Sequence, residues 1–66
     1  MWNYEGMKVW GKYMGEFPVV GVVELSRVAY GGEVKHTVVL GEPIMVYGAE
    51  RERVILSHSE IERVKG

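Results

Sequence analysis

The chain contains no cysteine, only two prolines and no excess of either charge. The absence of cysteine excludes disulfide bonds, thiolate metal sites and a cysteine nucleophile. Lys plus Arg number 8 against 9 for Asp plus Glu, so the net charge of -1 provides no overall field to hold a polyanion such as duplex DNA. Nucleic-acid binding would require a local cluster of basic side chains.

Long apolar runs and low-complexity tracts are also missing. No stretch approaches the ~18 consecutive apolar residues of a membrane span, and residues 1–6 lack the basic and apolar parts of a signal peptide. We therefore expect a soluble cytoplasmic protein. With 66 residues the chain forms at most one domain, residues 1–66. A domain of this size buries only about 60% of the surface that unfolding exposes, so its core must be small.

The strongest structural signal lies in residues 19–40, where two β-rich runs are joined by Gly31-Gly32. A two-residue type I′ turn needs positive φ at both central positions, which glycine adopts without strain. The sequence therefore predicts a long hairpin with these glycines at its tip. Counting outward from a two-residue turn places Arg27 opposite His36 on the apolar side of the ribbon. Alternatively, a β-bulge would flip half of the ribbon and carry this pair to solvent.

Shorter elements surround this hairpin. The pattern predicts strands at residues 7–13, 44–47, 53–56 and 61–64, and a single 3₁₀ turn at residues 57–60 before the last strand. Ser57 and Glu60 have the spacing of a capping box, which explains this polar turn better than a catalytic role does. The alternating charges of residues 50–53 are typical of a solvated sheet edge.

Short strands in succession, a long central hairpin and a polar turn before the final strand resemble the small SH3-like barrels. The resemblance covers residues 7–64 at the level of pattern, and it implies an all-β barrel of five to six strands with a C-terminal 3₁₀ turn. The aromatic pairs of peptide-binding SH3 domains are not evident near Tyr13 and Phe17, so no functional residue is carried over. The composition also resembles that of small phage and plasmid proteins, which implies an inhibitor or adaptor of a host defence component.

One group of candidate binding residues gathers near the predicted hairpin tip. Arg27, Tyr30, Lys35 and His36 would bring two cations, a ring and a titratable imidazole to a phosphate or a nucleotide. The alternative is a polar cross-strand pair at the edge of the ribbon. His36 and His58 are the only histidines, and without a carboxylate at motif spacing they predict no metal site. No cofactor is expected.

A second group of candidates is aromatic and lies near the N-terminus: Trp2, Tyr4, Trp10, Tyr13 and Phe17. Trp and Tyr are common anchors of protein interfaces, and an excess of such rings predicts a homo-oligomer or a foreign protein partner. The same rings interleave with Lys8 and Lys12 and would suit a single-stranded nucleic acid, although the near-neutral net charge argues against it. Core packing is the remaining interpretation.

No motif assigns an enzymatic reaction, because the chain shows no converging acid, base and nucleophile. The leading hypothesis is a non-enzymatic binding protein that acts through a protein–protein surface. The alternatives are nucleotide or small-anion binding and nucleic-acid binding of the small-barrel type.

Overall fold

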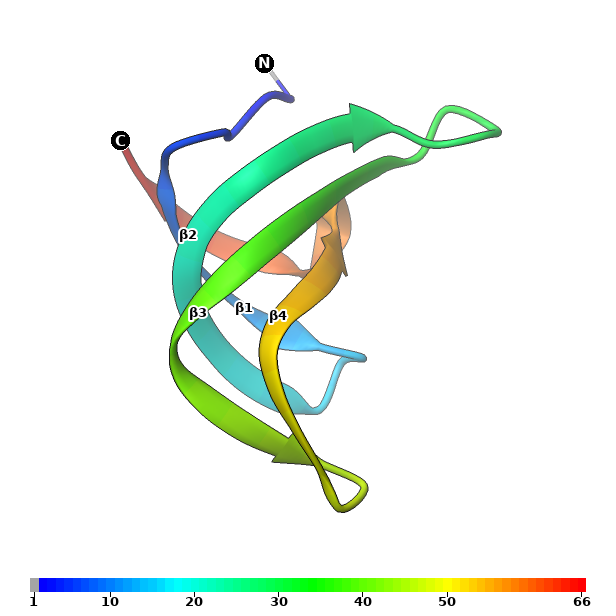
Figure 1. Cartoon of the computed structure of the whole chain (residues 1–66). Helices are drawn as coiled ribbons and strands as arrows, with labels where there is room; N and C mark the ends of the chain where they lie inside the picture. Colours follow the sequence, from blue (N-terminus) through cyan, green and yellow to red (C-terminus); the bar gives the residue numbers. More distant parts are fainter. Residues whose placement is uncertain (1) are drawn as a thin grey trace.

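A computed structural model describes residues 2–66 of the chain. Within them five antiparallel strands follow one another: β1 Lys8–Tyr13, β2 Phe17–Val28, β3 Val34–Val46, β4 Ala49–Ser57 and β5 Ile61–Lys65. A 3₁₀ turn, η1 His58–Glu60, separates β4 from β5 (Figure 1). The all-β class, the long β2–β3 hairpin and the C-terminal 3₁₀ turn are confirmed. Among the same residues, no helix has the length and apolarity to cross a bilayer.

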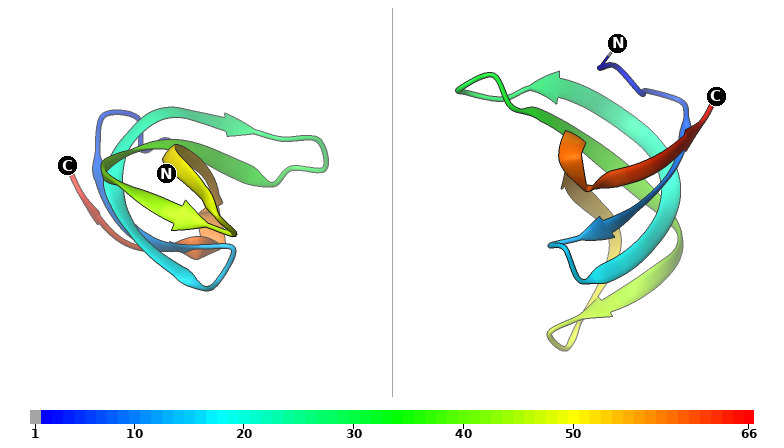
Figure 2. Two further views of the ribbon diagram at one scale, coloured as in Figure 1. Left: turned by 60° about the horizontal axis from the view of Figure 1, so that its bottom comes forward. Right: turned by 180° about the vertical axis from the view of Figure 1, so that it is seen from behind.

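The strands form one sheet in the order β4-β3-β2-β1-β5. Figure 2 shows this sheet curling around an interior, with β5 beside β1. In the part of the chain that the structure describes, no ladder joins β4 to β5, so the sheet curls as a small barrel does but is not closed by hydrogen bonds. The predicted strand at residues 44–47 is not separate, because β3 continues through it, and the strand count is therefore five.

β2 and β3 are long enough to belong to two parts of the sheet. β2 pairs with β1 along residues 17–22, and it pairs with β3 from Gly21 towards the hairpin tip. β3 pairs with β2 up to Leu40, and after a register shift its last residues pair with β4. The two strands therefore diverge beyond Gly21 and Leu40, which opens a gap on one side of the sheet.

The core is small and aliphatic. Alternate side chains on the strands point inward, as expected for a sheet with one buried face. The buried cluster consists of Val9, Val19, Val23, Val38, Leu40, Val54 and Leu56. Two polar side chains, Ser26 and His36, are buried beside it with exposed fractions of 6% and 0%. Tyr4 and Tyr13, two of the aromatic residues predicted as interface anchors, are partly buried and pack against the margin of this core.

The tip of the β2–β3 hairpin is longer than predicted. Gly31 and Gly32 lie there with positive φ angles of 92° and 87°, as expected. The connection is not a two-residue turn, however, since Gly32 N–H donates to the Ala29 carbonyl and Ala29 N–H donates to the Glu33 carbonyl. Near the tip, the register is shifted by one residue from the predicted one as a consequence.

A β-bulge at Glu24 in β2 shifts the register once more. On the tip side of this bulge, Ser26 pairs with His36, and Arg27 pairs with the residue before His36. The prediction that Arg27 lies opposite His36 is therefore wrong. A one-residue slip exchanges the two faces of a strand, so Arg27 turns outward while His36 stays on the core side.

Gly21 permits a close approach of β2 to β3. A Cβ atom at this position would clash with the Val39 carbonyl and lie 2.8 Å from Val38 Cγ1, whereas a Cβ at Gly41 would meet nothing within 4 Å. We expect Gly21→Ala to lower the free energy of unfolding by about 2–3 kcal/mol, because the backbone must move. The matched control Gly41→Ala should change it by less than about 0.5 kcal/mol. Urea denaturation measures both, and equal effects would contradict the close approach.

Candidate functional site

Four side chains from separate parts of the chain meet at one end of the core. Ser26 Oγ and His36 Nδ1 are 2.7 Å apart, and His36 Nε2 lies 3.0 Å from Nδ1 of His58. The Tyr4 ring stacks on both imidazoles, with centroid distances of 4.9 Å to His36 and 5.1 Å to His58. We refer to these four residues as the histidine cluster. It joins β2, β3, η1 and the segment before β1.

The 3₁₀ turn brings His58 to this cluster. Ser57 N–H donates to the Glu60 carboxylate at 2.9 Å, which closes the turn directly after β4. The capping box predicted for Ser57 and Glu60 is confirmed. Among residues 2–66, no third metal-ligating side chain joins the two histidines.

One arrangement of protons is consistent with all three hydrogen bonds that link the cluster. Tyr4 N–H donates to Ser26 Oγ at 3.1 Å, the Ser26 hydroxyl donates to His36 Nδ1, and His36 Nε2–H donates to Nδ1 of His58. Both imidazoles are neutral in this arrangement. Burial, and to a lesser extent the proximity of His58, lower the pKa of His36 below its ordinary value of 6.5. His36 is therefore neutral at pH 7.

A second feature lies on the opposite side of the sheet. In the strand registers Trp10 faces Val20, Lys8 faces Val22, and Val22 faces Val39. Directly paired residues project from the same side of a sheet, so these five side chains form one surface, which we refer to as the outer face. Its three valines are between 37% and 47% exposed. The outer face thus has an apolar centre in contact with water.

Several basic side chains project from the same side of the sheet as this apolar centre. By the same pairing and alternation, seven of the chain's 8 Lys and Arg residues project outward: Lys8, Lys12, Arg27, Lys35, Arg53, Arg63 and Lys65. The Trp10 ring centroid is 5.2 Å from the Lys8 ammonium and 4.8 Å from the Arg63 guanidinium, so two cation–π contacts hold the ring. Two of these cations are paired with carboxylates, Arg53 with Glu24 at 3.0 Å and Lys35 with Glu33 at 2.9 Å. Within residues 2–66, the other five form no ion pair.

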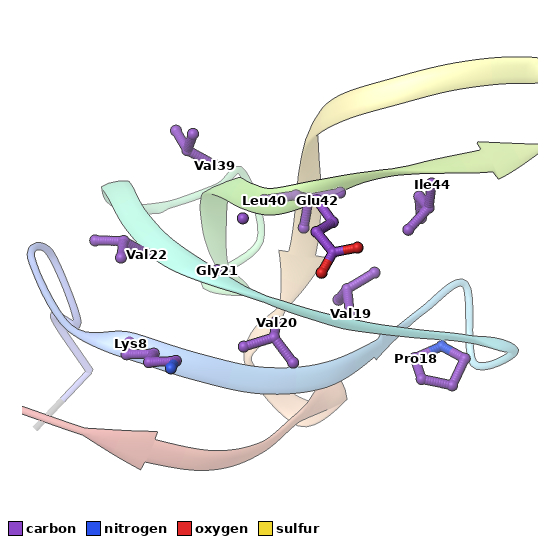
Figure 3. A pocket seen from close by; sticks show the side chains of 11 residues that line it. Lys8, Pro18, Val19, Val20, Gly21, Val22, Val39, Leu40, Glu42 and Ile44 are labelled. Carbon is purple, nitrogen blue, oxygen red and sulfur yellow. The ribbon is translucent and has the colours of Figure 1, made fainter.

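A groove with a volume of about 760 Å³ opens where β2 and β3 diverge. Figure 3 shows its lining, in which the three valines of the outer face are joined by Val19 of β2 and Ile44 of β3. Lys8 and Glu42 are the charged side chains that line it. The groove thus extends the apolar centre of the outer face into a depression.

The structure does not assemble the predicted anion site. Arg27 and Lys35 pair across the strands and project outward, and the Lys35 ammonium forms an ion pair with Glu33 at 2.9 Å. Tyr30 is fully exposed at the hairpin tip. His36 is fully buried and points to the core side of the sheet. The four predicted residues therefore lie on different sides of the hairpin.

The five predicted aromatic anchors are also dispersed. Tyr4 belongs to the histidine cluster, and Trp2, close to it in the chain, is 43% exposed. Trp10 lies on the outer face of β1. Phe17 packs edge-on against a tyrosine of the β3–β4 turn, and Tyr13 packs at the margin of the core. Only Trp10 contributes to the apolar and basic surface described above.

Sequence reasoning did not find the contacts of Ser26 and His58 with His36. The one available signal was that the two histidines are the chain's only ones. Neither the bulge that turns Ser26 inward nor the fold that brings η1 over β3 has a pattern in the sequence.

A buried neutral imidazole makes stability depend on pH. The pKa of His36 is lower in the folded protein than the 6.5 of the unfolded chain, so below pH 6.5 the unfolded state binds more protons. The free energy of unfolding should fall as the pH is lowered from 7.5 to 5, with a slope approaching about 1.4 kcal/mol per pH unit. Urea denaturation at several pH values gives this slope, which His36→Gln should flatten. A wild-type stability that is constant over this range would refute the assignment.

Comparison with known proteins leaves the function to the geometry. No family model, curated protein or solved structure matches this chain. The two features that geometry offers are the histidine cluster and the outer face.

Proposed function

We propose that this chain is a non-enzymatic binding protein that holds another protein against its outer face. The observation that supports this proposal is the apolar centre formed by Trp10 and three exposed valines, with outward cations beside it in the strand registers. Protein interfaces commonly have an apolar centre anchored by Trp and Arg and a polar rim. The complementary partner is a protein surface with an apolar centre and an acidic margin.

The geometry of Trp10 favours tight association. Side chains that must be immobilised on binding reduce affinity, because their rotational freedom is lost. Here Lys8 and Arg63 already hold the indole ring in the free protein. The groove beside the valines accepts a projecting side chain of the partner, and its aliphatic lining would be removed from water on contact.

A protein of 66 residues that binds in this way acts by covering its partner's surface. Covering a surface is the mechanism of an inhibitor or an adaptor. A host defence component is the partner class that the resemblance to small phage and plasmid proteins implies.

The outward cations also favour a second candidate function, the binding of nucleic acid, because they could neutralise phosphates. The groove beside these cations favours a protein partner instead, because it is lined mainly by aliphatic side chains and offers no ring on which a base could stack.

Two valine variants test the proposed surface. Val22→Glu places a carboxylate in the middle of the outer face, and the control Val28→Glu places one at the tip end of β2. The two valines are 47% and 52% exposed, so both variants should fold. A partner captured from extracts of the source cells and then purified should bind wild type and Val28→Glu equally. It should bind Val22→Glu at least about tenfold more weakly by calorimetry, a loss of about 1.4 kcal/mol.

Three outcomes would contradict the proposal. The first is equal affinity of the partner for Val22→Glu and for the wild type. The second is capture of nucleic acid, recognised by its loss on nuclease treatment and by binding that weakens as salt is raised. The third is a dimer, seen by light scattering at tens of micromolar, that Val22→Glu dissociates, because the outer face would then join two copies of this chain.

A further inference from the structure

The segment before β1, residues 2–7, runs close to β2 (Figure 1). Hydrogen bonds attach it to that strand at two places. Close to β1, two backbone hydrogen bonds of 2.8 and 2.9 Å join it to Val23. Nearer its start, Tyr4 N–H donates to Ser26 Oγ at 3.1 Å, and Ser26 N–H donates to the Glu5 carboxylate at 2.9 Å. The second attachment is part of the histidine cluster.

The Tyr4 side chain makes this attachment sensitive to the state of the imidazoles. Its ring is stacked on His36 with an angle of 14° between the planes and on His58 with an angle of 26°. A change in charge or position of either imidazole therefore acts directly on the segment that carries Tyr4.

The hydrogen-bonded chain of the cluster cannot take up a proton without leaving one of its hydrogens without an acceptor. A proton added to His36 binds its Nδ1. If His58 carries the charge instead, the hydrogen between the two rings lies on Nδ1 of His58, and the hydrogen of His36 again lies on its Nδ1. Ser26 Oγ must then accept from both His36 and Tyr4 N–H. The hydroxyl hydrogen of Ser26 is left without an acceptor in the cluster, and a positive charge is placed in a buried position.

The charged groups around the cluster are already engaged or point away. On the N-terminal segment, Glu5 accepts from the β2 backbone, and on η1, Glu60 accepts from the backbone at the start of the turn. From β4 the cluster meets Leu56, the buried partner of His36. On β2 and β3, Arg27 and Lys35 neighbour the cluster in sequence but project from the opposite side of the sheet. Among the described residues neither histidine forms an ion pair with a carboxylate.

We propose that the histidine cluster is a proton-sensitive latch that holds residues 2–7 on β2 at neutral pH and releases them at mildly acidic pH. Release lets water reach the protonated imidazole and the Ser26 hydroxyl, which relieves the cost of their burial. It also frees Trp2 and Tyr4 together and uncovers the edge of β2 near Val23. The latch gives the protein an aromatic segment and a strand edge that a partner meets only at acidic pH.

Amide hydrogen exchange followed by NMR between pH 7.5 and 5 tests this latch. The amides of Tyr4, Gly6 and Ser26 report on the segment, and those of Val38 and Val54 report on the centre of the sheet. After correction for intrinsic rates, the opening constant of the segment should rise by up to about tenfold per pH unit below the midpoint of the imidazole titration. The sheet amides should remain at least about a hundredfold more protected than the segment throughout.

Two results would overturn the latch in the wild-type chain itself. One is an opening constant of the segment that does not depend on pH. The other is an opening constant of the segment that equals that of the sheet at every pH, because both would then exchange only through global unfolding. The amide shifts of Gly6 and the imidazole Cε1–H shifts of His36 must also follow a single midpoint. Separate midpoints would show that the segment responds to another group.

Variants separate proton uptake from packing. The double variant His36→Gln with His58→Gln keeps hydrogen-bonding groups but has no titratable ring, so its segment should open equally at pH 5 and 7.5. The variant Tyr4→Ala removes the stacked ring, and its segment should be open at both pH values. A double variant that keeps the pH response of the wild type would overturn the role of the histidines.

Discussion

One extra residue in β2, Glu24, determines which side chains face the interior and which face water. Beyond this bulge the inward positions are taken by Ser26 and its partner His36, and the outward ones by Arg27 and Lys35. A regular strand would have turned the Arg27 guanidinium towards the aliphatic core, where an unpaired charge is very costly. The bulge thus places Ser26 in the neutral polar cluster inside and Arg27 among the cations outside.

The histidine cluster matters for a chain of this size because so little else is buried. The rest of the buried core is valine and leucine, and His36 is among its largest fully buried side chains. An unpartnered polar group in such a core would cost about 2–7 kcal/mol, but Ser26 and His58 provide a partner for each ring nitrogen. Within residues 2–66, no buried side-chain polar atom lacks a hydrogen bond. A fully satisfied network fixes one arrangement of the elements that meet there, and for the same reason it tolerates an added proton poorly.

The sequence was informative where a residue type has a single structural use. Gly31-Gly32 predicted the hairpin tip, and alternation along β3 predicted that His36 shares a side with the core valines. A bulge was considered, but its position could not be predicted, because residues 19–23 are valine or glycine in both phases of alternation and therefore fit either register. The prediction that residues 41–43 separate two strands was wrong, because β3 continues through them. Pro43 is tolerated in β3 at the register shift, where no ladder pair requires its missing N–H.

The apolar residues that project from both sides of β2 also bear on the proposed function. A single curled sheet has one interior, so it can bury only one side of each strand, and the valines of the other side remain in water. Val20, Val22 and Val39 are therefore an excess that the core of this fold cannot use. On β1, by contrast, the outward positions of the same surface carry Lys8 and Lys12 on either side of an indole. The outer face therefore has apolar side chains at its centre and cations at its margin. A surface that is complementary to it has apolar groups opposite the valines and acidic groups opposite the cations.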